Sequence, residues 1–262
     1  MVLKVKYQLK EQDQIAVLMM NTANAVAVFY AAMKLGCIAL MINTKLREAE
    51  IRNYLEELNP KVIISDARWL DKAAPVAETL GLPPVVTENT NFDREDLHVA
   101  VSSVQNPENT AVIMHTSGTT GKPKGIMVTQ RNILEAAYGY QEVQKTDASD
   151  ITVLSVPLFH ILGLLMSYAY LCRGATVCLP ANYKPETLAR EIDAYRVSDM
   201  AAVGAIYLAL AEAPGFEENV VPNLHLCMIA GGMSTPVQMM RLELQFANAT
   251  FINMYGQSEG AP

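Results

Sequence analysis

The sequence predicts an α/β protein built from two largely parallel β-sheets flanked by helices. Short apolar runs alternate with amphipathic segments of helical period along most of the chain. Glycine, proline and helix-capping residues separate these segments. The 262 residues are 51% hydrophobic and only 18% charged, so much of the chain is interior. A repeated β-α-β order implies parallel strands joined by right-handed crossovers.

The first part of the chain predicts three strands and three helices. Gly36 is placed to end the first helix, Thr44 can cap the second, and Pro60 follows where the second should stop. We expect strands at 15–20, 37–42 and 61–65, and helices at 24–35, from Thr44 to about Asn59, and 67–80.

The pattern weakens between Gly81 and Asn109, where prolines and asparagines interrupt it. We therefore expect a linker or an excursion there, between two sheet subdomains at about 1–105 and 106–262. Order resumes with a strand at 111–115, a glycine-rich loop and a helix from about Gln130. Further strands are expected at 151–155, 175–179, 199–203, 225–230 and 250–254, with helices at 161–171, 186–195, 205–212 and 236–247.

Composition limits the classes of function. The formal net charge of −7 argues against a duplex-binding protein, so we expect no nucleic-acid partner. No apolar run approaches the roughly 20 residues of a spanning helix. The N-terminus lacks the apolar core of a signal peptide, so we expect a cytoplasmic location. The four cysteines form no Cys-x-x-Cys pair, which favours free thiols over a zinc or redox site.

Residues 116–125, Thr-Ser-Gly-Thr-Thr-Gly-Lys-Pro-Lys-Gly, have the chemistry of a phosphate-binding loop. Glycines let the backbone approach a ligand closely, and successive N–H groups can form an anion-binding concavity. Hydroxyls and two lysines add donors and positive charge. Pro123 follows Lys122, so the run does not fit the common Gly-Lys-Ser/Thr nucleotide loop. The alternative is a flexible surface loop.

Three later segments follow predicted strands and also have plain structural interpretations. In Pro157–Gly163, His160 at a strand–helix junction is by itself more often structural. In Ala230–Ser234, the double glycine could be a tight turn before a helix that Ser234 or Thr235 caps. Tyr255-Gly256-Gln257-Ser258-Glu259 could be a surface turn.

In this order, the four segments resemble the motifs of the adenylate-forming superfamily. That superfamily includes acyl- and aryl-CoA synthetases, luciferases and the adenylation domains of peptide synthetases. The helix, glycine and strand in Ala31–Asn43 fit as well, so the resemblance covers nearly the whole chain. It implies the fold of the N-terminal domain of acyl-CoA synthetases and an AMP-forming acid–thiol ligase, with ATP and Mg²⁺ bound and CoA as co-substrate.

The resemblance also implies roles for individual residues. Catalytic roles fall to Thr116, Lys124, His160 and Glu259, with Glu259 as the ligand to magnesium. Lys122 and Lys124 would neutralise phosphate charge, and Tyr255 would stack on adenine. The nucleotide-binding residues would be Thr116, Ser117, Gly118, Thr119, Thr120, Gly121, Lys122, Lys124, Gly231, Gly232, Met233, Asn253, Met254, Tyr255, Gly256, Gln257 and Ser258.

Some features leave the substrate open. Gln130 stands where many members have histidine, and Val203 lacks the proline that often follows it. The helix after His160 is uncharged, which favours a fatty or other apolar acyl or aryl acid over the amino acid of a carrier-protein-loading adenylation domain. Family members continue beyond Pro262 into a hinge and a small C-terminal domain. We therefore expect an incomplete N-terminal domain, with weak ATP affinity and little turnover; a non-catalytic nucleotide-binding module is the other alternative.

Overall fold

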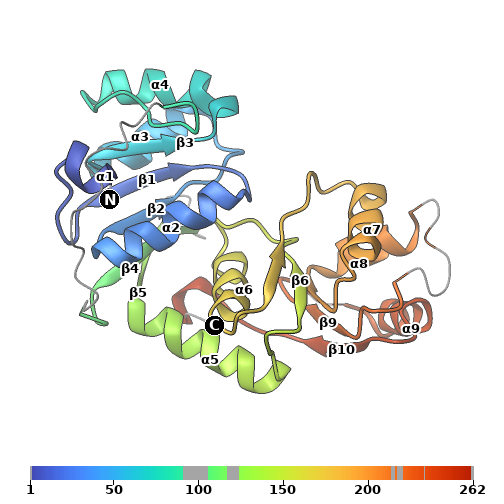
Figure 1. Cartoon of the computed structure of the whole chain (residues 1–262). Coiled ribbons are helices and arrows are strands. Elements are labelled where there is room, and N and C mark those ends of the chain that lie inside the picture. The colour runs from blue at the N-terminus through green and yellow to red at the C-terminus, as the bar shows by residue number, and fades with distance from the viewer. Residues whose placement is uncertain are drawn as a thin grey trace. The chain divides into compact units, whose positions relative to one another are not determined.

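The computed structural model describes residues 2–90, 106–116, 124–213, 216, 221–232 and 234–260. The chain forms two compact units, Met1–Leu134 and Glu135–Pro262, each built on its own five-stranded sheet. In Figure 1 the first sheet carries the blue-to-green strands and the second carries the yellow-to-red strands. This arrangement confirms the predicted fold class of two mostly parallel sheets flanked by helices.

The first unit has the strand order β3-β1-β2-β4-β5. Strands β1, β2, β3 and β4 are parallel, and β5 joins β4 in the antiparallel direction. Its elements are α1 Val2–Lys6, β1 Gln14–Leu18, α2 Ala23–Leu35, β2 Ile38–Met41, α3 Glu48–Leu58, β3 Val62–Ser65, the 3₁₀ helix Ala67–Trp69, α4 Leu70–Thr79, β4 Thr110–Thr116 and β5 Lys124–Thr129.

The second unit has the order β10-β9-β8-β6-β7, with every neighbouring pair parallel. Helix α5, Gln130–Gln144, crosses the boundary between the units. The remaining elements are β6 Ile151–Val153, α6 Ile161–Leu171, β7 Thr176–Cys178, α7 Pro185–Ala194, β8 Asp199–Ala202, α8 Gly204–Ala211, β9 Leu226–Ile229, α9 Pro236–Gln245, β10 Thr250–Asn253 and the 3₁₀ helix Ser258–Gly260.

The division between the units lies later than the expected one near residue 105. Strand β4 pairs in parallel with β2, and β5 extends the same sheet, so both strands belong to the first unit. Strand β5 was not expected from the sequence. Its alternation places Met127 at 69% exposure and Val128 at 1%, which is the pattern of a strand buried on one face.

Local capping explains where several helices begin and end. Gly36 ends α2 at φ 69°, a left-handed conformation that glycine adopts readily, as expected. Thr235 caps α9, and its N–H donates to the side-chain oxygen of Gln238 at 2.9 Å. Thr44 is not a cap: α3 starts after Arg47, whose N–H donates to the Glu50 carboxylate at 2.7 Å. The expected helix start at Thr44 was therefore wrong.

Each unit buries its own apolar core. In the first unit Leu40, Leu55 and Val76 are fully buried between sheet and helices. In the second unit Met200 and Tyr207 are fully buried in the same way.

The four cysteines are free thiols, and Cys172 is exposed rather than buried. No helix in the described ranges is long and apolar enough to cross a membrane.

Candidate functional site

A cavity of about 320 Å³ lies in the second unit, beyond the carboxyl ends of its parallel strands. Its walls come from the segments that follow four strands, β6, β8, β9 and β10, and from Tyr140 of α5. Ligand sites in parallel α/β sheets are typically found at this edge, because the connecting loops are free to vary while the strands hold them in place. The lining residues are Tyr140, Val156, His160, Ile161, Leu162, Val203, Ala230, Gly231, Met254, Tyr255, Gly256, Gln257 and Ser258.

Three of the four segments that the sequence analysis singled out meet in this cavity. They contribute His160, then Ala230 and Gly231, then Tyr255 to Ser258. These segments are far apart in the chain, and the parallel order of the strands alone brings their ends to one edge. The cavity therefore joins residues that the sequence could only list separately.

His160 reaches the cavity from the residue that precedes α6. It is the N-cap position of that helix, and its N–H donates to the carbonyl of Pro157 at 2.9 Å. Its imidazole packs on the ring of Phe159, with 4.8 Å between the ring centroids. Phe159 is 7% exposed and anchors the turn, whereas His160 is exposed. The turn thus holds an accessible imidazole against a fixed aromatic neighbour.

Gly231 sits where a side chain would be costly. Its φ is +76°, and a Cβ atom there would lie 3.1 Å from Cγ1 of Val203, which also lines the cavity. Glycine at this position leaves main chain as the cavity wall. The neighbouring Gly232 is exposed and is not among the lining residues. Met233 lies outside the described residues.

The segment after β10 supplies one wall of the cavity. The Met254 N–H donates to the carbonyl of Ile229 at 2.7 Å, which ties the segment to the end of β9. Tyr255 is 93% exposed, so its ring is available to a ligand at no cost in core packing. Glu259 follows directly after Ser258, is exposed on the last 3₁₀ helix, and is not among the lining residues.

A second cavity, of about 410 Å³, shares Tyr140, Met254 and Tyr255 with the first. Helix α5 contributes Ala136, Gly139, Tyr140, Val143 and Gln144 to one wall. Met228 and Ile252 are register neighbours on β9 and β10 and form another wall, with Asn253 at the end of β10. Every lining residue of this cavity is uncharged.

Sequence reasoning missed the residues of α5, Tyr140 above all. A signal was present: Ala136, Gly139, Tyr140 and Val143 recur at the spacing of one helix face. The pattern identifies a face, but it does not say whether that face packs against a core or lines a cavity. Met228 and Ile252 carry even less signal, because buried strands are apolar on both faces.

The glycine-rich loop starts and ends in the first unit. Thr116 ends β4 and Lys124 begins β5, and the two residues are register partners in the antiparallel pair. The loop therefore connects two strands, with α5 following β5. Lys124 is exposed. The predicted phosphate-binding residues between them, Ser117, Gly118, Thr119, Thr120, Gly121 and Lys122, lie outside the described residues.

Residues next to the loop are well anchored. Thr129 and Asn132 exchange hydrogen bonds at the start of α5, with 3.0 Å from Thr129 N to Asn132 Oδ1 and 3.1 Å from Asn132 N to Thr129 Oγ1. Gln130 donates to the carbonyl of Met33 at 3.1 Å. His115 packs on Tyr54 at 4.1 Å between ring centroids, and burial lowers the pKa of its imidazole.

Comparison with known proteins finds a match to the AMP-binding enzyme family over residues 1–262. An oxalate–CoA ligase of Arabidopsis thaliana is 28% identical over 267 residues, which span 96% of this chain and 51% of that protein. The solved long-chain-fatty-acid–CoA ligase of Archaeoglobus fulgidus superposes with a TM-score of 0.88 at 19% identity, covering 100% of this chain and 56% of the other.

A second solved structure, ATP-bound MatB from Rhodopseudomonas palustris, has a TM-score of 0.84 at 19% identity. It covers 98% of this chain and 52% of its own. At these identities the superpositions establish a shared fold. The chain spans about half the length of the curated relatives it matches.

Proposed function

The chain belongs to the AMP-binding enzyme family, and from this premise we propose that it is the nucleotide- and acid-binding part of an AMP-forming acid–CoA ligase. The observation that carries the proposal is the meeting of His160, Gly231 and Tyr255–Ser258 at one cavity beyond the carboxyl ends of the sheet. The curated relatives that the chain matches include CoA ligases for several different acids.

The proposed reaction has two steps. A carboxylate oxygen of the acid attacks the α-phosphorus of ATP, forming an acyl-adenylate and releasing pyrophosphate. The sulfur of CoA then attacks the acyl carbon, forming the thioester and releasing AMP. Both steps exchange one bond for another, and neither needs an oxidant or a reductant.

In this proposal the nucleotide lies against the segment 255–258. The exposed ring of Tyr255 offers a face for adenine, and Gly231 leaves main chain as another part of the same cavity wall. Ser258 places a hydroxyl at the cavity wall, where it can donate to a phosphate oxygen. The loop between Thr116 and Lys124 would hold the departing pyrophosphate through backbone N–H groups and lysines.

Magnesium fits the carboxylate of Glu259. This side chain is an exposed hard-oxygen donor, one residue beyond the lining Ser258. When bound there with ATP, the ion would offset phosphate charge as the pyrophosphate leaves. The protein's own contribution is to orient the nucleotide through Tyr255 and Ser258.

The second cavity supports an apolar acid as the substrate class. Its uncharged walls, with Val143, Met228 and Ile252 among them, would bury a hydrocarbon chain or aryl ring favourably. Because Tyr140, Met254 and Tyr255 border both cavities, an acid could place its carboxylate in the first and its apolar part in the second. His160, exposed at the first cavity, would lie beside the carboxylate.

Acid-dependent exchange of radiolabelled pyrophosphate into ATP tests the proposal. We expect exchange with fatty or aromatic monocarboxylic acids and much less with oxalate or malonate, measured on this chain and on any longer product of its reading frame. Exchange only with amino acids would favour a carrier-protein-loading domain. ATP binding without exchange in every form would identify a non-catalytic nucleotide-binding module.

A further inference from the structure

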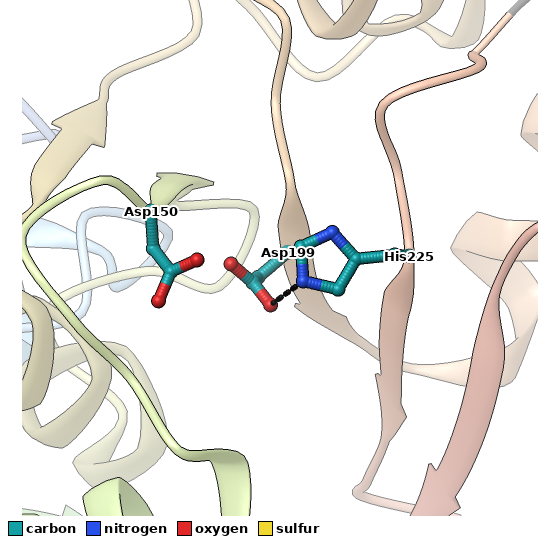
Figure 2. A group of neighbouring side chains, drawn as sticks. All are labelled: Asp150, Asp199 and His225. Atoms are coloured by element: carbon teal, nitrogen blue, oxygen red, sulfur yellow. Dashed lines mark ion pairs between the residues drawn. The ribbon is translucent and has the colours of Figure 1, made fainter.

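Asp150, Asp199 and His225 lie close together, as Figure 2 shows, at the edge of the second sheet opposite the cavity. Asp150 directly precedes β6, Asp199 is the first residue of β8, and His225 directly precedes β9. Because the strands are parallel, their amino ends lie together just as their carboxyl ends do. One ligand atom of each residue lies within 4.8 Å of the others.

Both aspartates accept hydrogen bonds from donors outside the cluster, and the Ser198 hydroxyl also lies 3.5 Å from Asp150 Oδ1. Asp150 Oδ2 accepts from the backbone N–H of Asp147 at 2.8 Å. Asp199 Oδ2 accepts from the Ser198 hydroxyl, which itself accepts from the Ile151 N–H at 2.9 Å. These contacts orient both carboxylates, and Asp199 Oδ1 lies 3.7 Å from Nε2 of His225.

The imidazole of His225 is oriented in the same manner. Its Nδ1 lies 3.3 Å from the carbonyl oxygen of Asn223, and a carbonyl can only accept, so Nδ1 carries the proton. Nε2 of the same ring faces Asp199 Oδ1 at 3.7 Å, the pair that the dashed line marks in Figure 2. Histidines that bind metals commonly donate their other N–H to a carbonyl in this way.

Burial makes this arrangement unfavourable unless a positive charge lies within it. Asp199 is only 3% exposed, and Asp150 contributes a second carboxylate to the same small space. Two carboxylates and an imidazole nitrogen that face one another at this distance are a ligand set that a divalent cation can take.

We propose that Asp150, Asp199 and His225 bind one divalent transition-metal ion, with Zn²⁺ as the preferred class. The mixture of two carboxylates and one imidazole suits Zn²⁺ better than Ca²⁺ or Mg²⁺, which take oxygen ligands. Tetrahedral Zn²⁺ with bonds of about 2.0 Å needs ligand atoms roughly 3.3 Å apart, so the cluster must contract. The exposed ring of His225 can make that movement by rotating.

The ion would join the amino ends of β6, β8 and β9, while the cavity lies beyond their carboxyl ends. Its role would be to stabilise the second unit, and His225 would leave a coordination position open to solvent. The site is independent of the proposed ligase reaction, whose magnesium ligand, Glu259, follows β10.

The test is Zn²⁺ titration of the chelator-treated full chain, followed by calorimetry and thermal unfolding. We expect saturable binding of one ion and a rise in Tm of about 5–10 °C when free Zn²⁺ is 100 times its Kd. Asp199→Asn and His225→Ala should abolish this rise. Asp193→Asn, which changes an exposed aspartate on α7, is the matched control and should retain it.

Because His225 is exposed, its substitution leaves the core intact and keeps the test valid if Asp199→Asn does not fold. If Zn²⁺ does not change the Tm of the unaltered chain, the proposal is overturned, since the cluster would then hold only a proton. A Zn²⁺ response that persists in His225→Ala would overturn it as well, by placing the ion elsewhere.

Discussion

The carbonyl oxygen of Pro157 lies 2.4 Å from the position that a Cβ atom on Gly163 would occupy. The carbonyl oxygen of Val156 lies 2.6 Å from the same position. Both contacts are to backbone, which cannot move aside as a flexible side chain could. Helix α6 therefore packs directly on the turn that carries His160, and the absence of a side chain at residue 163 sets the place of that turn.

Substituting Gly163 by alanine should displace the turn and destabilise the second unit. We expect a loss of about 1–3 kcal/mol in the free energy of unfolding, the usual cost of overpacking, measured by denaturant titration. Gly139→Ala is the control, because nothing lies within 4 Å of its added Cβ and alanine favours the helix. Equal stability of Gly163→Ala and the unaltered chain would show that the turn is not constrained.

Replacing Tyr255 by alanine should weaken nucleotide binding without affecting the fold. The ring is 93% exposed, so its removal costs little packing, whereas loss of adenine stacking costs about 1–2 kcal/mol, or roughly 5–30-fold in Kd. Tyr255→Phe should bind as the unaltered chain does. Calorimetric titration with ATP makes the comparison, with Tyr195→Ala as an exposed tyrosine outside the cavity. An ATP affinity in Tyr255→Ala equal to that of the unaltered chain would show that adenine does not stack on this ring.

Glu259→Gln should raise the magnesium requirement of pyrophosphate exchange. The amide keeps the shape of the side chain but removes the negative charge that holds the ion. We expect the Mg²⁺ concentration for half-maximal exchange to rise at least about tenfold, the lower end of what loss of a supporting partner costs. Glu243→Gln, an exposed glutamate on α9, should leave that concentration as it was. If Glu259→Gln depends on the Mg²⁺ concentration as the unaltered chain does, the ion is held by other ligands.

The half-buried imidazole of His115 should make the stability of the chain depend on pH. Its pKa is lowered in the folded state, mainly by burial, so the unfolded chain takes up this proton at higher pH than the folded chain does. The contribution to stability is complete above the usual histidine pKa and declines as the pH falls below it. We expect Tm to fall between pH 7 and 5, and to fall less steeply in His115→Gln. Parallel curves for the two proteins would contradict this assignment.

Much of the architecture could be predicted from the sequence because local signals agree with it. Gly36 and Pro60 mark helix ends, and the apolar runs of β1, β2 and β3 indicate a buried parallel sheet. Strand β5 escaped prediction because its alternation covers only six residues and begins within the glycine-rich run. The start of α3 was misplaced because Thr44 has the chemistry of a cap, whereas Arg47 and Glu50 form the hydrogen bonds.

The sequence by itself determined that the segments around His160, Gly231 and Tyr255 are candidates for the site, because each has a chemical pattern that is readable along the chain. Only the tertiary structure decided that the three segments share a cavity, that Tyr140 and Met228 border a second one, and that Asp150, Asp199 and His225 meet at the far edge. The physical reason is the parallel sheet. It aligns the ends of strands that are distant in sequence, and single residues at those ends carry no local pattern that reveals their neighbours.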